Sequence, residues 1–146
     1  MITLFFTIFS SLLIFVLGQY FLKLIFEPII AFKESLGALS AFCLMNRAII
    51  TNAHASLEHQ KELLQLTSII LSKKEAILGY SILARSKCFN IPSERNILNA
   101  CQKLNLVTGG MCPNTDSNKR TTVSCTRVFS ELHDVSKLLN IRLDFE

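Results

Sequence analysis

The opening of the chain constrains it most, because no charged side chain occurs from Ile2 to Leu22. A helix of this length can cross a bilayer core of about 30 Å. The run holds five phenylalanines and ends at the first basic residue, Lys23. The sequence therefore predicts a transmembrane anchor within residues 1–27.

Two other structures would also use a long apolar run. A cleaved signal peptide begins with basic residues and ends in small ones. Here no Lys or Arg precedes Ile2, and the run ends in the bulky sequence GQYFLKLIFEP. A buried core helix rarely stays uncharged over such a length. Both alternatives fit less well than an uncleaved anchor.

The basic residues near the span predict its orientation. None lies before it, whereas Lys23, Lys33 and Arg47 follow it. Basic residues that flank a span stay on the cytoplasmic side. We expect a single-pass protein of the cytoplasmic (inner) membrane with its N-terminus outside and its C-terminal domain in the cytoplasm. The five cysteines all follow the span, so free thiols are expected.

One face of the anchor carries small and hydroxylated residues. At about 100° per residue, they fall within an arc of about 100°. These residues are Thr3, Thr7, Ser10, Ser11 and Gly18. Such a stripe lets helices approach and hydrogen-bond in lipid, or it could line a pore in a ring of subunits. Alternatively, the hydroxyls bond back to their own helix.

Residues 28–146 are enough for one small domain with its own core. Apolar residues at three- and four-residue steps indicate helices in this part. We expect them at 29–53, with a polar turn at Asn46 and Arg47, at 57–78, at 94–106, and from a cap at Thr121 or Thr122 to Asn140.

The breaks between these helices are short and polar. Ser56 and Ser93 are expected N-caps, and Gly79 and the pair Gly109–Gly110 are expected helix ends. Residues 111–120 have the composition of a flexible loop. The tail, IRLDFE, alternates apolar and charged residues and fits either an edge strand or an extended docking segment. The fold class expected is all-α: one N-terminal transmembrane helix followed by a cytoplasmic bundle of about four helices.

Two Arg–His spacings are the only candidates for catalysis. Arg47 precedes His54 by seven residues, and Arg127 precedes His133 by six. On helices, these spacings are expected to place each pair on nearly one face. The segments RAIITNAH and RVFSELH resemble the Arg-then-His element of the helical HEPN ribonucleases. That resemblance implies a pair, supplied twice in a dimer, that polarises and deprotonates a ribose hydroxyl. Polar contacts at the surface or between helices are the preferred interpretation.

A run of basic residues could contact nucleic acid or lipid headgroups. It consists of Lys73, Lys74, Arg85, Lys87 and Arg95. Such residues more often only solvate a surface, and little aromatic interleaving supports base stacking. No CxxC pair, phosphate-binding loop or nucleophile elbow is present, so neither a metal nor a cofactor is expected.

Three longer segments, QYFLKLIFEPI, FKESLGALS and NIPSERNILNACQKLNLVTGG, resemble a group of uncharacterised bacterial single-pass, membrane-anchored helical proteins. In architecture, the chain is similar to the HEPN-like membrane accessory protein of RNA-targeting CRISPR systems. That similarity implies an oligomeric pore and a role in antiviral defence. The chain departs from the HEPN pattern, because an apolar residue follows each Arg.

These observations predict a non-enzymatic effector or accessory protein. It would be anchored in the membrane, form homo-oligomers and could form a pore in antiviral defence. One alternative is a membrane-tethered HEPN-type ribonuclease. The other is a tether that recruits a soluble protein partner to the membrane.

Overall fold

A computed structural model describes residues 2–52, 54–86, 89–111 and 125–143. The described chain contains helices and no strand, so the all-α prediction is confirmed. The helices are α1 (Ile2–Phe21), the π-helical turn η1 (Leu22–Phe26), α2 (Glu27–Met45), α3 (Arg47–Thr51), α4 (Leu57–Glu75), α5 (Tyr80–Arg85), α6 (Glu94–Gly110) and α7 (Cys125–Leu139).

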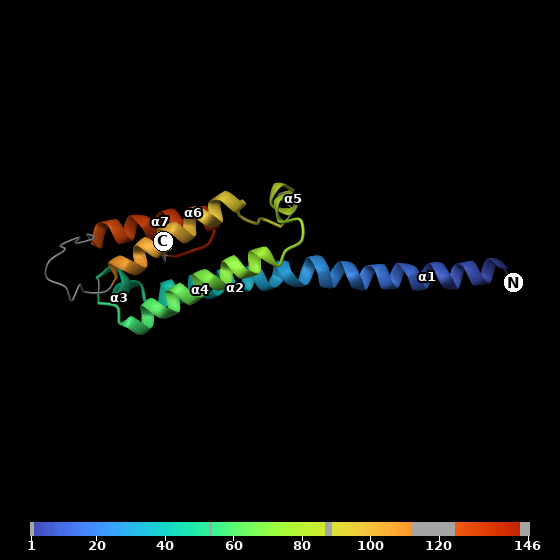
Figure 1. Ribbon diagram of the computed structural model, residues 1–146, viewed down its shortest axis with the longest axis horizontal. Helices are drawn as coiled ribbons and strands as arrows, with labels where there is room; N and C mark the ends of the chain where they lie inside the picture. Colours follow the sequence, from blue (N-terminus) through green and yellow to red (C-terminus); the bar gives the residue numbers. More distant parts are fainter. Residues whose placement is uncertain (1, 53, 87–88, 112–124, 144–146) are drawn as a thin grey trace.

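The segments α1, η1 and α2 form one continuous rod (Figure 1). Pro28 has no amide hydrogen, and its ring crowds the carbonyl four residues earlier. Directly before it, the amide of Glu27 donates to the carbonyl of Leu22, five residues back. This wider turn carries the helix past the proline. Of the two outcomes that Pro28 allows, a continued helix and a new one, the structure has the continued helix.

The rod has two parts with opposite surroundings. None of the side chains in α1 is buried. From Ile29 onward, one side of α2 is buried in the domain, including Phe32, Leu36 and Leu39. The rod therefore supplies both an exposed apolar segment and a central element of the core.

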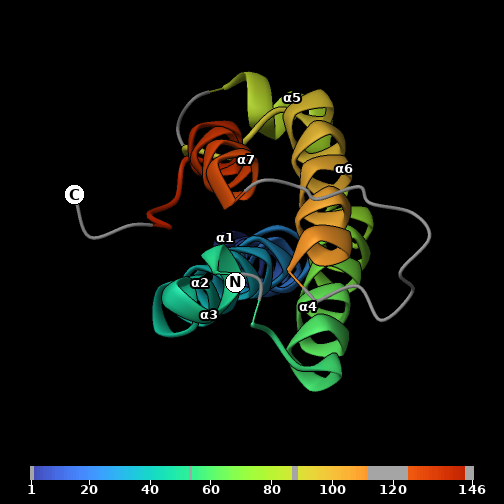
Figure 2. The same cartoon turned by 90° about the vertical axis from the view of Figure 1, so that its left-hand side faces the viewer.

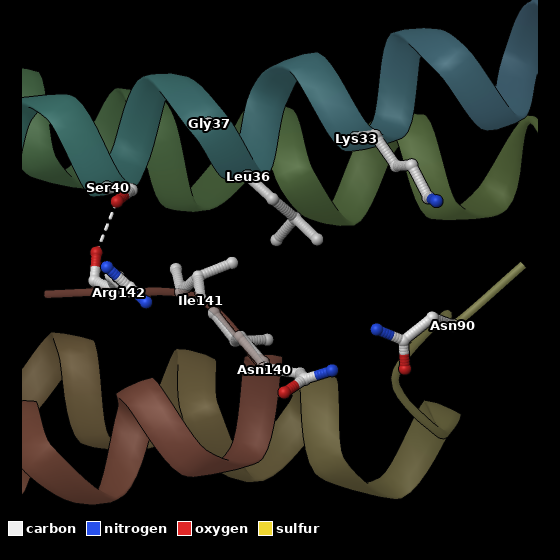
Figure 3. A pocket seen from close by; sticks show the side chains of 9 residues that line it. Lys33, Leu36, Gly37, Ser40, Asn90, Asn140, Ile141 and Arg142 are labelled. Atoms are coloured by element: carbon white, nitrogen blue, oxygen red, sulfur yellow. Dashed lines mark hydrogen bonds between the residues drawn. The ribbon is translucent and has the colours of Figure 1, made fainter.

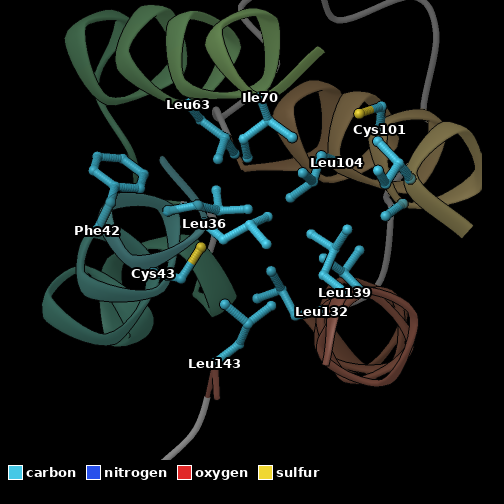
Figure 4. Packing of buried hydrophobic residues seen from close by; sticks show 14 of the residues in the cluster. Leu36, Phe42, Cys43, Leu63, Ile70, Cys101, Leu104, Leu132, Leu139 and Leu143 are labelled. Carbon is cyan, nitrogen blue, oxygen red and sulfur yellow. The ribbon is translucent and has the colours of Figure 1, made fainter. Parts of the chain in front are cut away.

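The domain is a bundle built on α2. Helix α4 packs on α2, α6 packs on both α4 and α7, and α3 contacts α7. The view along the rod in Figure 2 shows α4, α6 and α7 arranged beside α2. In Figure 4, Leu63 of α4, Leu104 of α6 and Leu139 of α7 point into the shared core.

The expected caps at three helix ends are confirmed. The Ser56 hydroxyl accepts a hydrogen bond from the amide of His59 at 3.4 Å, and Ser93 accepts one from Asn96 at 3.2 Å. Each bond satisfies an amide that has no partner within its helix. At the other end of the chain, Asn140 follows α7 with a φ of 55°, in the left-handed region that commonly ends helices.

The polar turn expected at Asn46 is present between α2 and α3, and the Asn46 side-chain amide donates to the Phe42 carbonyl at 3.0 Å. Other helix boundaries differ from the expected ones. Helix α4 ends at Glu75 rather than at residue 78, before a turn in which Gly79 has a φ of 67°.

Helix α6 ends at Gly110, within the glycine pair expected to stop it, and so extends four residues beyond the expected bound near residue 106. Met111 is fully buried, and its carbonyl accepts a hydrogen bond from Ala55 at 3.0 Å. Met111 is thus fixed rather than part of a flexible loop. The rest of the expected loop, 112–120, and the expected caps at Thr121 and Thr122 lie outside the described residues.

The described part of the tail lies along α2 as an extended segment without strand pairing. Leu143 is buried, and the Ser40 hydroxyl donates to the carbonyl of Arg142. Of the two alternatives for the tail, the docking segment is the one present through residue 143.

Core packing on α6 can be tested with a matched pair of leucines. Leu104 is fully buried, whereas Leu106 is 54% exposed. We expect Leu104→Ala to lower the free energy of unfolding by about 2–5 kcal/mol, because it leaves a cavity between α4, α6 and α7. Leu106→Ala should cost less than about 1 kcal/mol. Denaturant unfolding in detergent, followed by circular dichroism, measures both. Equal losses in the two variants would contradict this packing.

Candidate functional site

The first candidate site is the small-residue stripe on α1. Its hydroxyls bond back to the helix: Thr7 donates to the carbonyl of Thr3 at 2.9 Å, and Ser11 donates to that of Thr7 at 2.8 Å. Ser10 bonds the carbonyl of Phe6 at 2.8 Å. These hydroxyl donors are therefore satisfied without a partner helix, although each oxygen keeps a lone pair that can accept a hydrogen bond.

The stripe also contains open space. A side chain added at Gly18 would meet no atom within 4 Å, so another helix could approach the backbone there. On the opposite face, the rings of Phe5 and Phe9 stack with centroids 6.4 Å apart. The two faces of α1 thus differ in shape as the sequence predicts.

Within the described residues, one helix is long and apolar enough to cross a membrane, and it is the N-terminal rod. The apolar window of this rod has no buried residue, unlike a core helix of a soluble bundle. Length and composition of this kind also fit a signal sequence.

The first Arg–His pair does not lie on one helix. Helix α3 ends at Thr51, and His54 lies in the following turn, where its amide bonds the Ile49 carbonyl at 3.1 Å. The guanidinium of Arg47 lies 5.3 Å from the ring centroid of Phe129 on α7. This cation–π contact joins α3 to α7. The expectation of one shared helical face is wrong here.

The second pair lies on one helix but not on one face. Arg127 and His133 are both exposed on α7. Six residues correspond to a rotation of about 120° between the two side chains, since a turn holds about 3.6 residues. The expectation that this spacing aligns them is therefore also wrong. Neither pair forms the aligned Arg–His arrangement within one chain.

One member of the predicted basic patch is a structural residue. Lys74 is 7% exposed, and its ammonium lies 2.8 Å from Glu75 and 2.6 Å from Glu94. Hydrogen bonds to Glu75 and then Glu94 raise the pKa of Lys74. The ion pair with Glu94 links the end of α4 to the start of α6. Lys73, Arg85 and Arg95 are exposed, and Lys87 lies outside the described residues.

A second ion cluster, which the sequence did not reveal, joins α6 to α7. Lys103 lies 2.6 Å from Glu131 and 2.8 Å from Asp134. The Lys103 ammonium lowers the pKa of the Asp134 carboxyl. The two carboxylates are three residues apart on α7 and so share a face.

Figure 3 shows an open groove between α2 and the C-terminal segment. Its volume is about 320 Å³, and Asn90 stands across it from Lys33. The lining includes two cationic side chains, Lys33 and Arg142, and no carboxylate. Such a groove offers hydrogen-bond donors to an anion or a polar group. Sequence reasoning missed it, because its walls come from three distant segments without a shared motif.

The described residues hold no group of three or more His, Cys, Asp or Glu side chains that could bind a metal. Cys43 and Cys101 are buried free thiols, as expected. Burial raises the pKa of Cys101 to about 11, so its reactive thiolate form is scarce at neutral pH.

No family model, curated protein or solved structure matches this chain. The resemblance to bacterial membrane-anchored proteins and to the CRISPR accessory protein therefore stays a prediction.

The adjacent lysines 73 and 74 provide a test of the ion pairs. We expect Lys74→Met to lower the free energy of unfolding at neutral pH by about 1–3 kcal/mol, because Glu94 loses a desolvated partner. The raised pKa of Lys74 means that this contribution is complete at neutral pH and is lost only as the pH rises through the folded value. Lys73→Met, at an exposed site, should change stability by less than about 0.5 kcal/mol. Equal effects in denaturant unfolding would show that Lys74 does not link the helices.

Proposed function

We propose that this chain is a single-pass membrane protein of the inner membrane. Helix α1 spans the bilayer with its N-terminus outside, and residues 28–146 form a helical domain on the cytoplasmic side. The observation that carries this proposal is the continuous rod, which is apolar and wholly exposed in α1 and enters the core from Ile29 onward.

An uncleaved anchor fits the chain better than a signal sequence. The end of the run, GQYFLKLIFEP, is bulky and lacks the small residues that a cleavage site needs. The helix also continues without a break from α1 into α2. The basic residues that follow the span favour a domain on the cytoplasmic side of the membrane.

We further propose that the anchors associate through the stripe that contains Ser11 and Gly18. Lipid is as apolar as leucine, so helices in a bilayer associate by close packing and hydrogen bonds rather than by the hydrophobic effect. The open backbone at Gly18 permits such packing. In a ring of copies the same stripe would face water and form a pore.

The domain acts in this proposal as a non-enzymatic effector or accessory that holds the copies together. The two Arg–His pairs support catalysis poorly, because neither is aligned within one chain. The proposed place of the protein in antiviral defence depends on the architectural resemblance alone. If the anchors do not associate, the chain would instead serve as a tether for a soluble partner.

Association of the anchors can be tested on both faces of α1. We expect the wild-type chain to cross-link into oligomers in native membranes. Gly18→Leu should weaken association by about tenfold, because a bulky side chain separates the helices at a contact worth about 1–2 kcal/mol. Phe5→Leu, on the opposite face, should have little effect. The mass of the detergent-solubilised particle checks the result. A monomeric wild-type chain, or identical behaviour of the two variants, would contradict the proposal.

The ribonuclease alternative has its own test. We expect the double variant Arg127→Ala, His133→Ala to match the wild type in RNA cleavage by the purified protein and in toxicity on expression. The reason is that these side chains lie about 120° apart on α7 and so do not face one point within a chain. A loss of cleavage or toxicity in this variant, with unchanged circular dichroism, would replace the present proposal with the ribonuclease.

A further inference from the structure

Helix α5 lies at the end of the domain that is nearest to α1 (Figure 1). Two aromatic contacts hold this region against the rod. The rings of Phe89 and Phe26 are 5.9 Å apart, and those of Tyr80 and Phe32 are also 5.9 Å apart. The Tyr80 hydroxyl donates to the Pro92 carbonyl at 2.5 Å. The segment around α5 is therefore pinned beside η1 and the first turns of α2.

The same segment exposes large apolar side chains. Tyr80 points into the core, whereas Leu78 is 63% exposed and Ile82 is 76% exposed. The turn at Gly79, with a φ of 67°, separates Leu78 from α5 in a conformation that glycine adopts without strain. The domain thus leaves a leucine and an isoleucine uncovered at the end that adjoins the apolar rod.

Cationic side chains accompany these two residues. Lys73 lies in the last turn of α4, Arg85 lies in the last turn of α5, and both are exposed. The neighbouring acid Glu75 is engaged by Lys74. Opposing charges in this region are the exposed Glu27 and Glu34 on the rod and Glu94, which pairs with Lys74. Apolar side chains with cations beside them are the composition of a surface that lies on a membrane.

The rod sets how far α5 can be from lipid. The first charge after the span is Lys23, and Phe32 follows it by about 13 Å along the helix at about 1.5 Å per residue. The headgroup layer covers about half of that distance. Transmembrane helices tilt by about 20° on average, and a tilt toward the α5 side brings this off-axis helix closer to the bilayer.

We propose that Leu78 and Ile82 insert into the interfacial layer of the bilayer that holds α1, while Lys73 and Arg85 bind anionic phospholipid headgroups. This inference rests on the proposed membrane anchoring. The occupant of the exposed apolar surface is lipid, because the surface lies at the end of the domain nearest to α1 and carries the charge that complements acidic headgroups (Figure 1). This contact with lipid gives the domain a second attachment to the membrane in addition to α1.

The chain contains no tryptophan, which allows a direct test. Full-length Ile82→Trp is reconstituted into vesicles of phosphatidylcholine and phosphatidylglycerol, with and without brominated acyl chains. The matched control is Met45→Trp, because Met45 is 83% exposed at the end of α2 that is far from α1 (Figure 1). Both substitutions place an indole at an exposed apolar position, so folding should be kept. Leu78→Trp provides a second probe of the same surface.

We expect the indole at position 82 to emit at shorter wavelength than the one at position 45, and to be quenched at least about twofold more by brominated lipid. Adding Arg85→Gln should reduce the quenching in vesicles that contain phosphatidylglycerol and change it little in pure phosphatidylcholine. Absent quenching at both 82 and 78 would overturn the inference. A blue-shifted indole that brominated lipid does not quench would also overturn it, because a protein partner would then cover the surface.

The failure of the anchoring proposal gives a different result. If α1 is not an anchor, an alkaline carbonate wash releases the protein from the vesicles in every variant. If α1 is an anchor but α5 stays in water, the protein resists the wash and the indoles at 82 and 78 match the one at 45.

Discussion

The structure depends on one constraint, the absence of charge from Ile2 to Leu22 on a helix that no other element covers. In water this surface would expose large apolar side chains along the whole of α1, far more than a stable soluble domain leaves uncovered. In a bilayer core the same side chains would contact apolar lipid. A single helix is stable there because it satisfies its own backbone hydrogen bonds and needs no partner. The π-helical turn before Pro28 then matters, because it carries the helix into the domain without a hinge. The domain is consequently built on the continuation of α1.

Several local features could be predicted from sequence, because they depend on neighbouring residues. Ser56 and Ser93 cap helices because a hydroxyl ahead of a helix can bond an amide three residues on. The inner face of α7 at Val128, Leu132 and Val135 follows from helical spacing alone. Features that depend on tertiary contacts were missed. Helix α6 ends within the expected glycine pair, but Met111, expected at the start of a flexible loop, is buried directly after it.

The candidate sites show the same division between local and long-range information. The stripe on α1 depends on one helix, and the structure keeps its geometry. The Arg–His prediction assumed that each pair lies on one continuous helix that aligns the two side chains. Helix α3 ends at Thr51, before His54. Lys74 looked like a surface charge, because its partner Glu94 lies twenty residues away on another helix. The groove between α2 and the tail could not be predicted, because Ser40 and Arg142 meet only in the folded chain.

The central claim is that α1 stays in lipid with the domain inside the cell. Protease digestion of a carboxyl-terminal tag tests it most directly, in intact cells and in inverted inner-membrane vesicles. The account predicts a full-length chain in the membrane fraction, with the tag protected in cells and digested in inverted vesicles. A chain recovered in the soluble fraction, or a tag digested from outside intact cells, would contradict it.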